Sequence, residues 1–480
     1  MSELRPLRLL NSVENGTVLG AELNTYLSDA GRLAEFTVLF SQRGQAKRIA
    51  NGQTTMTAIV NSIIATNAAF LQATSTNDTI VAAIVESALA MSTVSDSASV
   101  LQIVSDNTTS WSYFSGSIYY ESHIKKIISH LSGVDPSLYG STSLLILDPV
   151  SMGDISVSER GMRALVNSLP TVTIMAGDSV AMALVAADTT AITLVAQNTS
   201  IMPTIANNVE AMDEIVSRSV ATALMASNAG AIQSIANNST AWANYLTSPT
   251  FSDNLKNIVA NIAGLTPSDY ADVNAIIGNA TALTAVASNS QASQALATSS
   301  SATTTLASSP NLSIILGSAT AMAHFGTEAS ILTFLNVSSA VPTVFGSSIA
   351  KGVIAASGTL VDFIGATSSI LSYLAGFTTT SIPTSLRSSA LATTSDDPFD
   401  GIPSKVLVLG MRANNIGAIA ATYSFNGSVV SGTNPGTGDI GLKGSVTESV
   451  CTAYTDPTWT VGGIAVTAAV SPEWTWYDLT

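Results

Sequence analysis

The sequence predicts a mainly α-helical chain, in which an α-solenoid of short helices in ten-residue repeats precedes a small C-terminal all-β, sandwich-like domain. Three observations predict this fold class. A ten-residue phrase recurs through much of the chain, as in AITLVAQNTS at 191–200 and AIQSIANNST at 231–240. A longer block recurs after 131 residues, and near residue 390 the composition changes to short apolar runs and glycine-rich turns.

The ten-residue phrase has the periodicity of a short helix. In its clearest units, from 181 to 240, position 1 is mostly Ala, and positions 2, 5 and 6 are mostly apolar. Residues spaced i, i+3 and i+4 lie on one face of a helix about two turns long. One continuous helix would need about 3.3 residues per turn to keep this repeat, against about 3.6 in an α-helix. The chain must therefore interrupt the helix in every unit.

Polar residues predict where each helix is interrupted. Hydroxyl side chains that suit an N-cap stand at Thr190, Ser200 and Thr240. Side chains that suit a left-handed C-terminal position stand at Asn198, Asn208, Asn228 and Asn238. Pro203 falls in a first turn, where its missing amide hydrogen costs little. Because so short a helix is not stable alone, we expect the helices to stack, with alanines at positions 1 and 6 permitting close approach.

A tandem duplication underlies the ten-residue units. A set of residues recurs without a gap 131 positions later: Trp111, Lys125, Gly133, Pro136 and Tyr139 become Trp242, Lys256, Gly264, Pro267 and Tyr270. Each copy closes with a longer helical insert, IKKIISHLSGVDPSLY in the first and LKNIVANIAGLTPSDY in the second. We interpret the matching Trp, Pro and Tyr residues as packing and turn positions where the insert docks, rather than as a shared binding site.

These features divide the chain into six parts. They are an N-terminal helical attachment segment (1–50), a first decad block with its insert (51–170), a second, duplicated block (171–300), further decads (301–385), a linker (386–404) and a C-terminal β domain (405–480).

The N-terminal segment carries a candidate docking surface. Arg43, Lys47 and Arg48 form the one concentration of positive charge in an acidic chain. One interpretation is favourable charge near a helix C-terminus. The other is a docking patch for an acidic partner, in which apolar Phe36 and Phe40 lie beside the bases.

The C-terminal part carries a candidate ligand surface. Three of the five tryptophans, Trp459, Trp474 and Trp476, fall here. In the run WTWYD, strand alternation places Trp474 and Trp476 on one face and Tyr477 on the other. Our first interpretation puts the tryptophan pair in a core. If the pair is exposed instead, it forms an aromatic platform that stacks on sugar rings, and a host-surface glycan becomes the natural ligand.

Composition excludes several classes of partner. The chain has 32 acids against 17 bases, a formal charge of −15, so we expect no nucleic-acid binding. A single cysteine, Cys451, excludes an internal disulfide framework and a thiolate zinc site. The start of the chain, MSELRPLRLLNS, has no apolar run of signal-peptide length. The apolar stretch 349–376 is interrupted by Asp362 and keeps the ten-residue repeat, so we expect no membrane insertion.

No pattern points to catalysis, a cofactor or a metal ion, and we expect a protein that is not an enzyme. His123 and His130 form the one spaced histidine pair, but Asn254 and Asn261 replace them in the second copy. The acids of DDPFDG at 396–401 could chelate calcium, although a solvated linker is the simpler interpretation. A glycan depolymerase would need a carboxylate pair, and the C-terminal part has few acids.

Three stretches resemble the NSxTAM-type decapeptide repeats of tailed-bacteriophage virion proteins. They are ANNSTAW at 236–242, ASNSQAS at 287–293 and FSQRGQAKRIANGQTTMTAIV at 40–60. The resemblance, which covers most of residues 40–375, implies a structural virion protein of the tail-fibre type, assembled in the host cytoplasm. It also implies other virion proteins as partners and a homo-oligomer, with a trimer favoured.

Alternatives to a tail fibre remain at this point. The resemblance does not separate a fibre from a neck, capsid-surface or baseplate protein, and the degenerate decads without a coiled-coil shaft favour a compact appendage over a long, thin fibre. A cell-surface adhesin or layer protein is the other alternative, for which an export signal would be needed.

Overall fold

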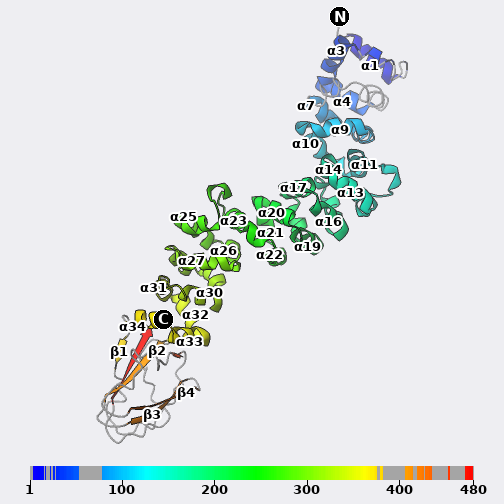
Figure 1. Ribbon diagram of the computed structural model, residues 1–480. Helices are drawn as coiled ribbons and strands as arrows, with labels where there is room; N and C mark the ends of the chain where they lie inside the picture. Colours follow the sequence, from blue (N-terminus) through cyan, green and yellow to red (C-terminus); the bar gives the residue numbers. More distant parts are fainter. Residues whose placement is uncertain are drawn as a thin grey trace. The chain divides into compact units, whose positions relative to one another are not determined.

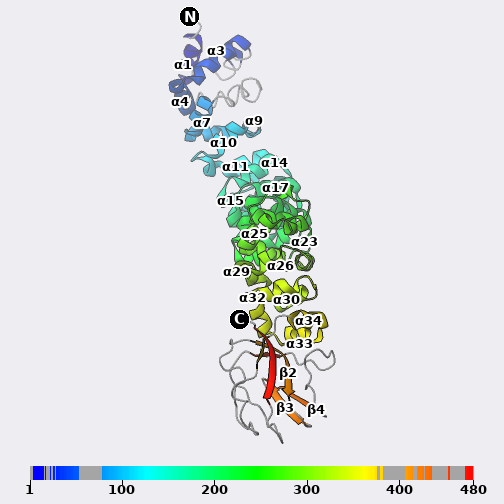
Figure 2. The same ribbon diagram turned by 90° about the vertical axis from the view of Figure 1, so that its left-hand side faces the viewer.

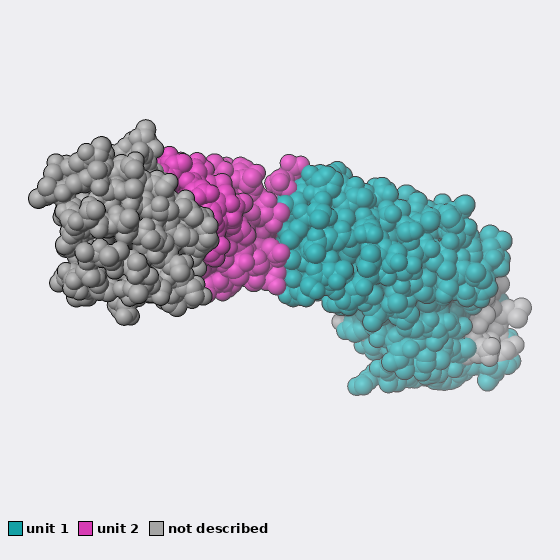
Figure 3. Space-filling view, turned by 90° about the horizontal axis from the view of Figure 1, so that it is seen from below, with its two compact units in different colours: residues 1–251 teal, residues 252–480 magenta. Residues whose placement is uncertain are grey.

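The computed structural model describes residues 4–15, 17, 22, 25–26, 29–52 and 78–375, together with six strands between 379 and 478. The described part contains 31 α-helices, which confirms the prediction of a mainly helical chain. The chain divides into two compact units, Met1–Phe251 and Ser252–Thr480, which Figure 3 shows in different colours. We describe each unit by itself.

Among the described residues, the first unit begins with α1 (Leu4–Glu14), α3 (Ala30–Ser41) and α4 (Arg43–Asn51). It continues as an array of short helices, which follow one another in chain order in Figure 1. The array contains α7 (Asp78–Val85), α8 (Ala88–Ser95), α9 (Ala98–Asp106), α10 (Thr108–Ser115), α11 (Tyr120–Ser132), the 3₁₀-helix η2 (Pro136–Leu138), α12 (Thr142–Leu147), α13 (Pro149–Val157), α14 (Glu159–Val166), α15 (Leu169–Ala176), α16 (Ser179–Ala187), α17 (Thr189–Gln197), α18 (Met202–Ala206), α19 (Val209–Val216), α20 (Ser219–Ser227), α21 (Ala229–Ala236) and α22 (Ser239–Leu246).

The second unit continues the same kind of array. Its helices, beginning with one that starts at the last residue of the first unit, are α23 (Phe251–Ile262), the 3₁₀-helix η3 (Pro267–Asp269), α24 (Val273–Gly278), α25 (Ala280–Ser288), α26 (Ser290–Thr298), α27 (Ser300–Ala307), α28 (Leu312–Leu316), α29 (Ala319–Phe325), α30 (Glu328–Leu335), α31 (Val341–Gly346), α32 (Ser348–Ala356), α33 (Gly358–Ala366) and α34 (Ser368–Ala375).

Within each unit, a helix of the array packs against its neighbours and against the third helix along the chain. In the first unit α13 contacts α16, and α16 contacts α19; in the second, α25 contacts α28 and α28 contacts α31. The chain changes direction sharply between helices, by 102° from α15 to α16 and by 99° from α32 to α33. After three such bends a helix lies against the one three places before it in the chain, so one turn of the array consists of three ten-residue units.

The core of the array follows the predicted pattern, including the close approach expected at the alanines of position 1. In α21 the residues at positions 1, 2, 5 and 6 are all buried: Ala231, Ile232, Ile235 and Ala236. Position 3, at Gln233, is exposed. Alanine at position 1 therefore belongs to the core as well, where its small side chain lets neighbouring helices approach.

The predicted N-caps were wrong by about two residues, and the left-handed conformation predicted for the asparagines was wrong. Asn208, Asn228 and Asn238 have extended backbones with φ between −108° and −99°, and each side-chain oxygen accepts the amide hydrogen of the third residue of the next helix. They are N-caps and not left-handed C-terminal residues. Asn198 also has negative φ. Among the described residues only Gly133 and Gly264 have positive φ.

The three hydroxyl residues predicted as N-caps are not N-caps. Thr190 and Thr240 are the second residues of α17 and α22, and Ser200 lies in the turn before α18. The error has a physical reason: a helix ends and the next begins within about one residue, so a single polar side chain serves the junction. Pro203 does lie in the first turn of α18, as predicted.

Several N-cap side chains also link one turn of the array to the next. Ser347 Oγ accepts the amide hydrogen of Ala350 at 3.3 Å and donates to the carbonyl oxygen of Leu316, at the end of α28, at 2.7 Å. That carbonyl is one of the last in its helix and has no intrahelical partner. The same two bonds are made by Ser87, Ser158, Asn289 and Ser318.

The duplication extends to the ends of the elements. The bounds of α10 and α22, of η2 and η3, and of α12 and α24 each differ by the 131-residue offset at both ends. The two left-handed glycines, Gly133 and Gly264, also correspond. Ser117 Oγ donates to Val85 O at 2.6 Å, and its counterpart Ser248 donates to Val216 O at 3.1 Å. These matches support the interpretation of the shared residues as packing and turn positions.

The strands are β1 (Thr379–Ser381), β2 (Val406–Asn414), β3 (Ile419–Phe425), β4 (Ser428–Asn434), β5 (Thr452–Tyr454) and β6 (Ser471–Asp478). One sheet has the order β1-β6-β2-β5, and β3 pairs with β4; Figure 2 shows β3 beside β4. A sandwich-like domain over 405–480 is not supported, since much of that range, and the predicted linker 386–404, lie outside the described residues.

In the described part, no single helix is long and apolar enough to cross a membrane, although two bent helix pairs reach that length and apolar composition together.

Two substitutions in α21 test which helix face is buried. Ile235→Asp should lower the free energy of unfolding by several kcal/mol, because it places an unpaired carboxylate in a site with no exposure. Gln233→Asp, two residues away on the exposed face, should change it little. Urea unfolding followed by circular dichroism measures both, and equal effects would show that the assigned face is wrong.

Adjacent serines test the bond between turns. Ser347→Ala removes both the cap and the link to Leu316, and we expect it to lower the free energy of unfolding by about 1–2 kcal/mol. Ser348→Ala, at the exposed next position, is the matched control and should be nearly silent. A calorimetric comparison in which both variants melt alike would refute the role of the cap.

Candidate interaction surfaces

The predicted N-terminal docking surface is partly wrong. Phe36 and Phe40 of α3 are buried, with 0% and 1% of their surface exposed, and their rings meet edge to face at a centroid distance of 6.2 Å. They form part of the core between α3 and its neighbours, so they offer no ring to a partner. The apolar spacing that we assigned to a docking face is the packing face of the helix.

The three bases of this surface differ in their ion-pair partners. Lys47 Nζ lies 2.7 Å from Glu86 Oε2, in the turn after α7, the helix that packs on α4. The hydrogen bond with Lys47 lowers the pKa of the Glu86 carboxyl group. Arg48 pairs with Glu14 of α1. Arg43 is exposed, and no ion pair of Arg43 occurs among the described residues. The cluster therefore fastens the N-terminal helices and leaves one guanidinium group for an outside contact.

The predicted C-terminal ligand surface falls largely outside the described residues. Trp459 is not among them. Trp474, Trp476 and Tyr477 lie in β6, which pairs with β1 on one side and β2 on the other. The structure describes the backbone of these three residues, so the choice between a core position and an exposed platform stays a prediction.

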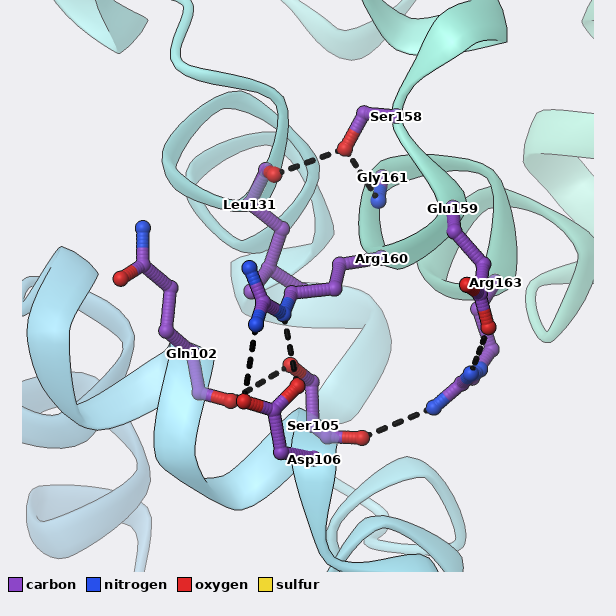
Figure 4. A network of polar contacts seen from close by, with 9 residues as sticks. All are labelled: Gln102, Ser105, Asp106, Leu131, Ser158, Glu159, Arg160, Gly161 and Arg163. Atoms are coloured by element: carbon purple, nitrogen blue, oxygen red, sulfur yellow. Dashed lines mark hydrogen bonds and ion pairs between the residues drawn. The ribbon is translucent and has the colours of Figure 1, made fainter.

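Polar contacts join α9 and α14, the helices that precede and follow the first insert in the chain, and another reaches the insert helix. Figure 4 shows Arg160 of α14 facing Asp106 of α9, with Nε–Oδ1 and Nη2–Oδ2 distances of 2.7 and 2.8 Å. Arg163 donates to the carbonyl oxygen of Ser105 at 2.8 Å and pairs with Glu159. Ser158, the cap of α14, donates to Leu131 O at the end of the insert helix α11. Both arginines are therefore held by partners within the chain.

The histidine pair lies on the insert helix beside charged groups. Partial burial is the main cause that lowers the pKa of His123 and of His130, and Lys126 lowers both further, while Asp96 opposes the shift. Lys126 and Asp96 form an ion pair between α11 and α8. Within the described residues, no group of three His, Cys, Asp or Glu side chains could hold a metal ion.

An exposed apolar surface that the helix pattern did not predict lies between residues 113 and 180. Large apolar side chains that the structure leaves exposed occur at Tyr113, Ile118, Leu138, Leu144, Leu147, Val150, Val157, Leu169 and Val180. In an isolated helix pattern such residues look like core positions. Aligning the two copies position by position would have found them, because the corresponding residues of the second copy are small or polar.

Comparisons with known proteins add no family assignment: no protein-family model and no curated protein matches the chain.

The histidine pair predicts a dependence of stability on pH. Because the folded-state pKa of both residues is lowered, the unfolded chain binds protons more readily, so stability should fall as the pH falls below about 6.5. Changing His123→Asn and His130→Asn, the residues found at 254 and 261, should flatten this dependence between about pH 7 and 5. Melting temperatures measured across that pH range test this prediction. If the melting temperature of the double variant depended on pH as steeply as that of the native chain, the two histidines would not be the source of the pH dependence.

Proposed function

We propose that the protein is a structural component of a tailed-bacteriophage particle, a tail-associated fibre or appendage in which a helical spacer separates an N-terminal attachment segment from a C-terminal region. The observation that supports this proposal is the ten-residue helical unit that recurs between residues 78 and 375, together with the resemblance of its sequence to phage decapeptide repeats. In this proposal the protein is no enzyme and uses no cofactor.

The physics of the array suits a spacer. Most units bury three or four positions against their neighbours, and several bond a helix end to an adjacent turn of the array, so local bending would break contacts in three helices at once. The exposed positions of the array hold mostly Ser, Thr, Asn and other small residues. Such side chains supply few of the aromatic or arginine anchors that dominate specific interfaces.

Attachment to the particle is assigned to the N-terminal segment. All three bases of the cluster are exposed, and Arg43 is the one for which no ion pair occurs among the described residues. The partners would be other virion proteins with acidic surfaces, and assembly as a homo-oligomer, with a trimer favoured, is part of the proposal. A host-surface glycan is proposed as the ligand of the C-terminal region.

Imaging and incorporation test the proposal together. In purified phage particles, an antibody to the chain should label the tail, and Arg43→Glu should lower the amount incorporated, because it reverses the exposed attachment charge. Ser348→Glu, which adds negative charge at an exposed position of the array, is the control and should incorporate normally. Removing residues 400–480 should leave incorporation intact and impair host attachment or a contact with a neighbouring protein.

Other outcomes would contradict it. Label on the neck or capsid would replace the tail assignment while keeping a virion protein. A chain found only on the host surface would favour an adhesin or layer protein, and loss of incorporation on removal of the C-terminal residues alone would reverse the proposed polarity.

A further inference from the structure

Over residues 113–180 and 244–311, which correspond at the 131-residue offset and are called the first and second copy below, the duplication shares a core and differs at the surface. Leu145 and Met152 are buried in the first copy, and their counterparts Ile276 and Leu283 are buried in the second. The nine exposed apolar residues of the first copy behave otherwise. Their counterparts, 131 residues later, are Asn244, Pro249, Asp269, Ala275, Gly278, Thr281, Ser288, Ser300 and Asn311. The second copy thus shows that the fold itself does not require large apolar side chains at these positions.

Four of these residues belong to helices that pack together. Leu144 and Leu147 lie about one turn apart on α12, and Val150 is the second residue of the following helix, α13. Val180 is the second residue of α16, which packs on α13. Their exposed fractions are 58%, 45%, 73% and 49%. We call these four residues the apolar edge.

The surroundings of the apolar edge are acidic. Asp148 and Asp178 are the N-caps of α13 and α16, and Asp154 is exposed on α13. Tyr139 Oη donates to Asp148 at 2.7 Å, which lowers the pKa of that carboxyl group and keeps it ionised. Between residues 127 and 217 the only bases other than histidine are Arg160 and Arg163, which are held in the pairs described above.

The acids disappear from the second copy together with the apolar residues. The counterparts of Asp148, Asp154 and Asp178 are Asn279, Ala285 and Ser309. Asn279 still caps its helix through its side-chain oxygen, so the capping role does not require a charge. The exposed apolar residues and these three aspartates thus occur together in one copy, and both are replaced at the corresponding positions of the other, which a purely structural role does not explain.

We propose that the apolar edge of the first copy binds a basic amphipathic segment of another protein, whose apolar side chains contact Leu144, Leu147, Val150 and Val180 while its Lys or Arg side chains pair with the three aspartates. A second copy of this chain is a poorer occupant, because two facing edges would bring six carboxylates together without a cation. The inference depends on the two copies alone and not on the proposed virion function.

A binding experiment with the full chain tests the proposal. The probe is a fluorescent synthetic helix of leucine on one face and lysine on the other, followed by anisotropy; the control probe carries glutamate in place of lysine. We expect the lysine peptide to bind, to bind more weakly as salt is raised, and to outcompete the glutamate peptide. Leu144→Ala, Val150→Thr and Val180→Asn together, each taken from the second copy, should weaken binding about tenfold or more.

Matched variants separate binding from folding. Val157→Ser removes an exposed apolar side chain outside the edge and should bind as the native chain does. The reverse graft, Ala275→Leu, Gly278→Leu, Asn279→Asp and Thr281→Val, should add a second site for the lysine peptide. The graft keeps the test decisive if the triple variant fails to fold.

Three results would overturn the proposal. They are equal binding of the two peptides, unchanged binding by a folded triple variant with no second site in the graft, and self-association of the native chain that the triple variant abolishes in sedimentation. The last result would identify a second copy as the occupant.

Discussion

Every ten-residue unit of this protein must find partners for the backbone groups at both ends of its helix, and the array depends on how it does so. A helix of eight or nine residues has more unpaired terminal amides and carbonyls than internal hydrogen bonds. The residue between two helices meets this need twice, as Ser347 and Ser158 show. Its side chain accepts a backbone amide hydrogen of the helix that follows and donates to a helix-terminal carbonyl oxygen in the adjacent turn of the array. Burial of positions 1, 2, 5 and 6 then holds the units together.

The duplication separates what the fold requires from what it only tolerates. Both copies keep the buried apolar positions, the left-handed glycine after the insert and the serine that bonds across turns. They differ at positions that are exposed to solvent in whole or in part. Arg160 and Arg163 correspond to Gln291 and Gln294, and the residues of the apolar edge correspond to small or polar residues. A duplicated spacer can therefore acquire a binding surface in one copy without disturbing the shared core.

Sequence periodicity predicted the array well because burial in it is local and repetitive. The spacing of Ile232 and Ile235 indicates one helix face, and both are buried there. The same reasoning failed at Phe36 and Phe40, since apolar spacing cannot show whether a face meets the chain's own core or a partner. It also placed the asparagines at the wrong helix end, because Asn suits an N-cap and a left-handed C-terminal residue equally. The C-terminal aromatic residues stay predictions.

By itself, the sequence determined the helical class, the length of the unit, the buried face and the duplication, because each follows from spacings along one chain. The tertiary structure decided which helices meet. That each helix packs on the third one along, that Ser347 reaches Leu316, and that Arg160 meets Asp106 depend on the angle between successive helices. It also decided which apolar residues stay outside, since Leu145 and Leu147 look alike in sequence and differ only in what covers them. The sequence sets the chemistry of each side chain, but the residues packed around a side chain determine whether it is exposed.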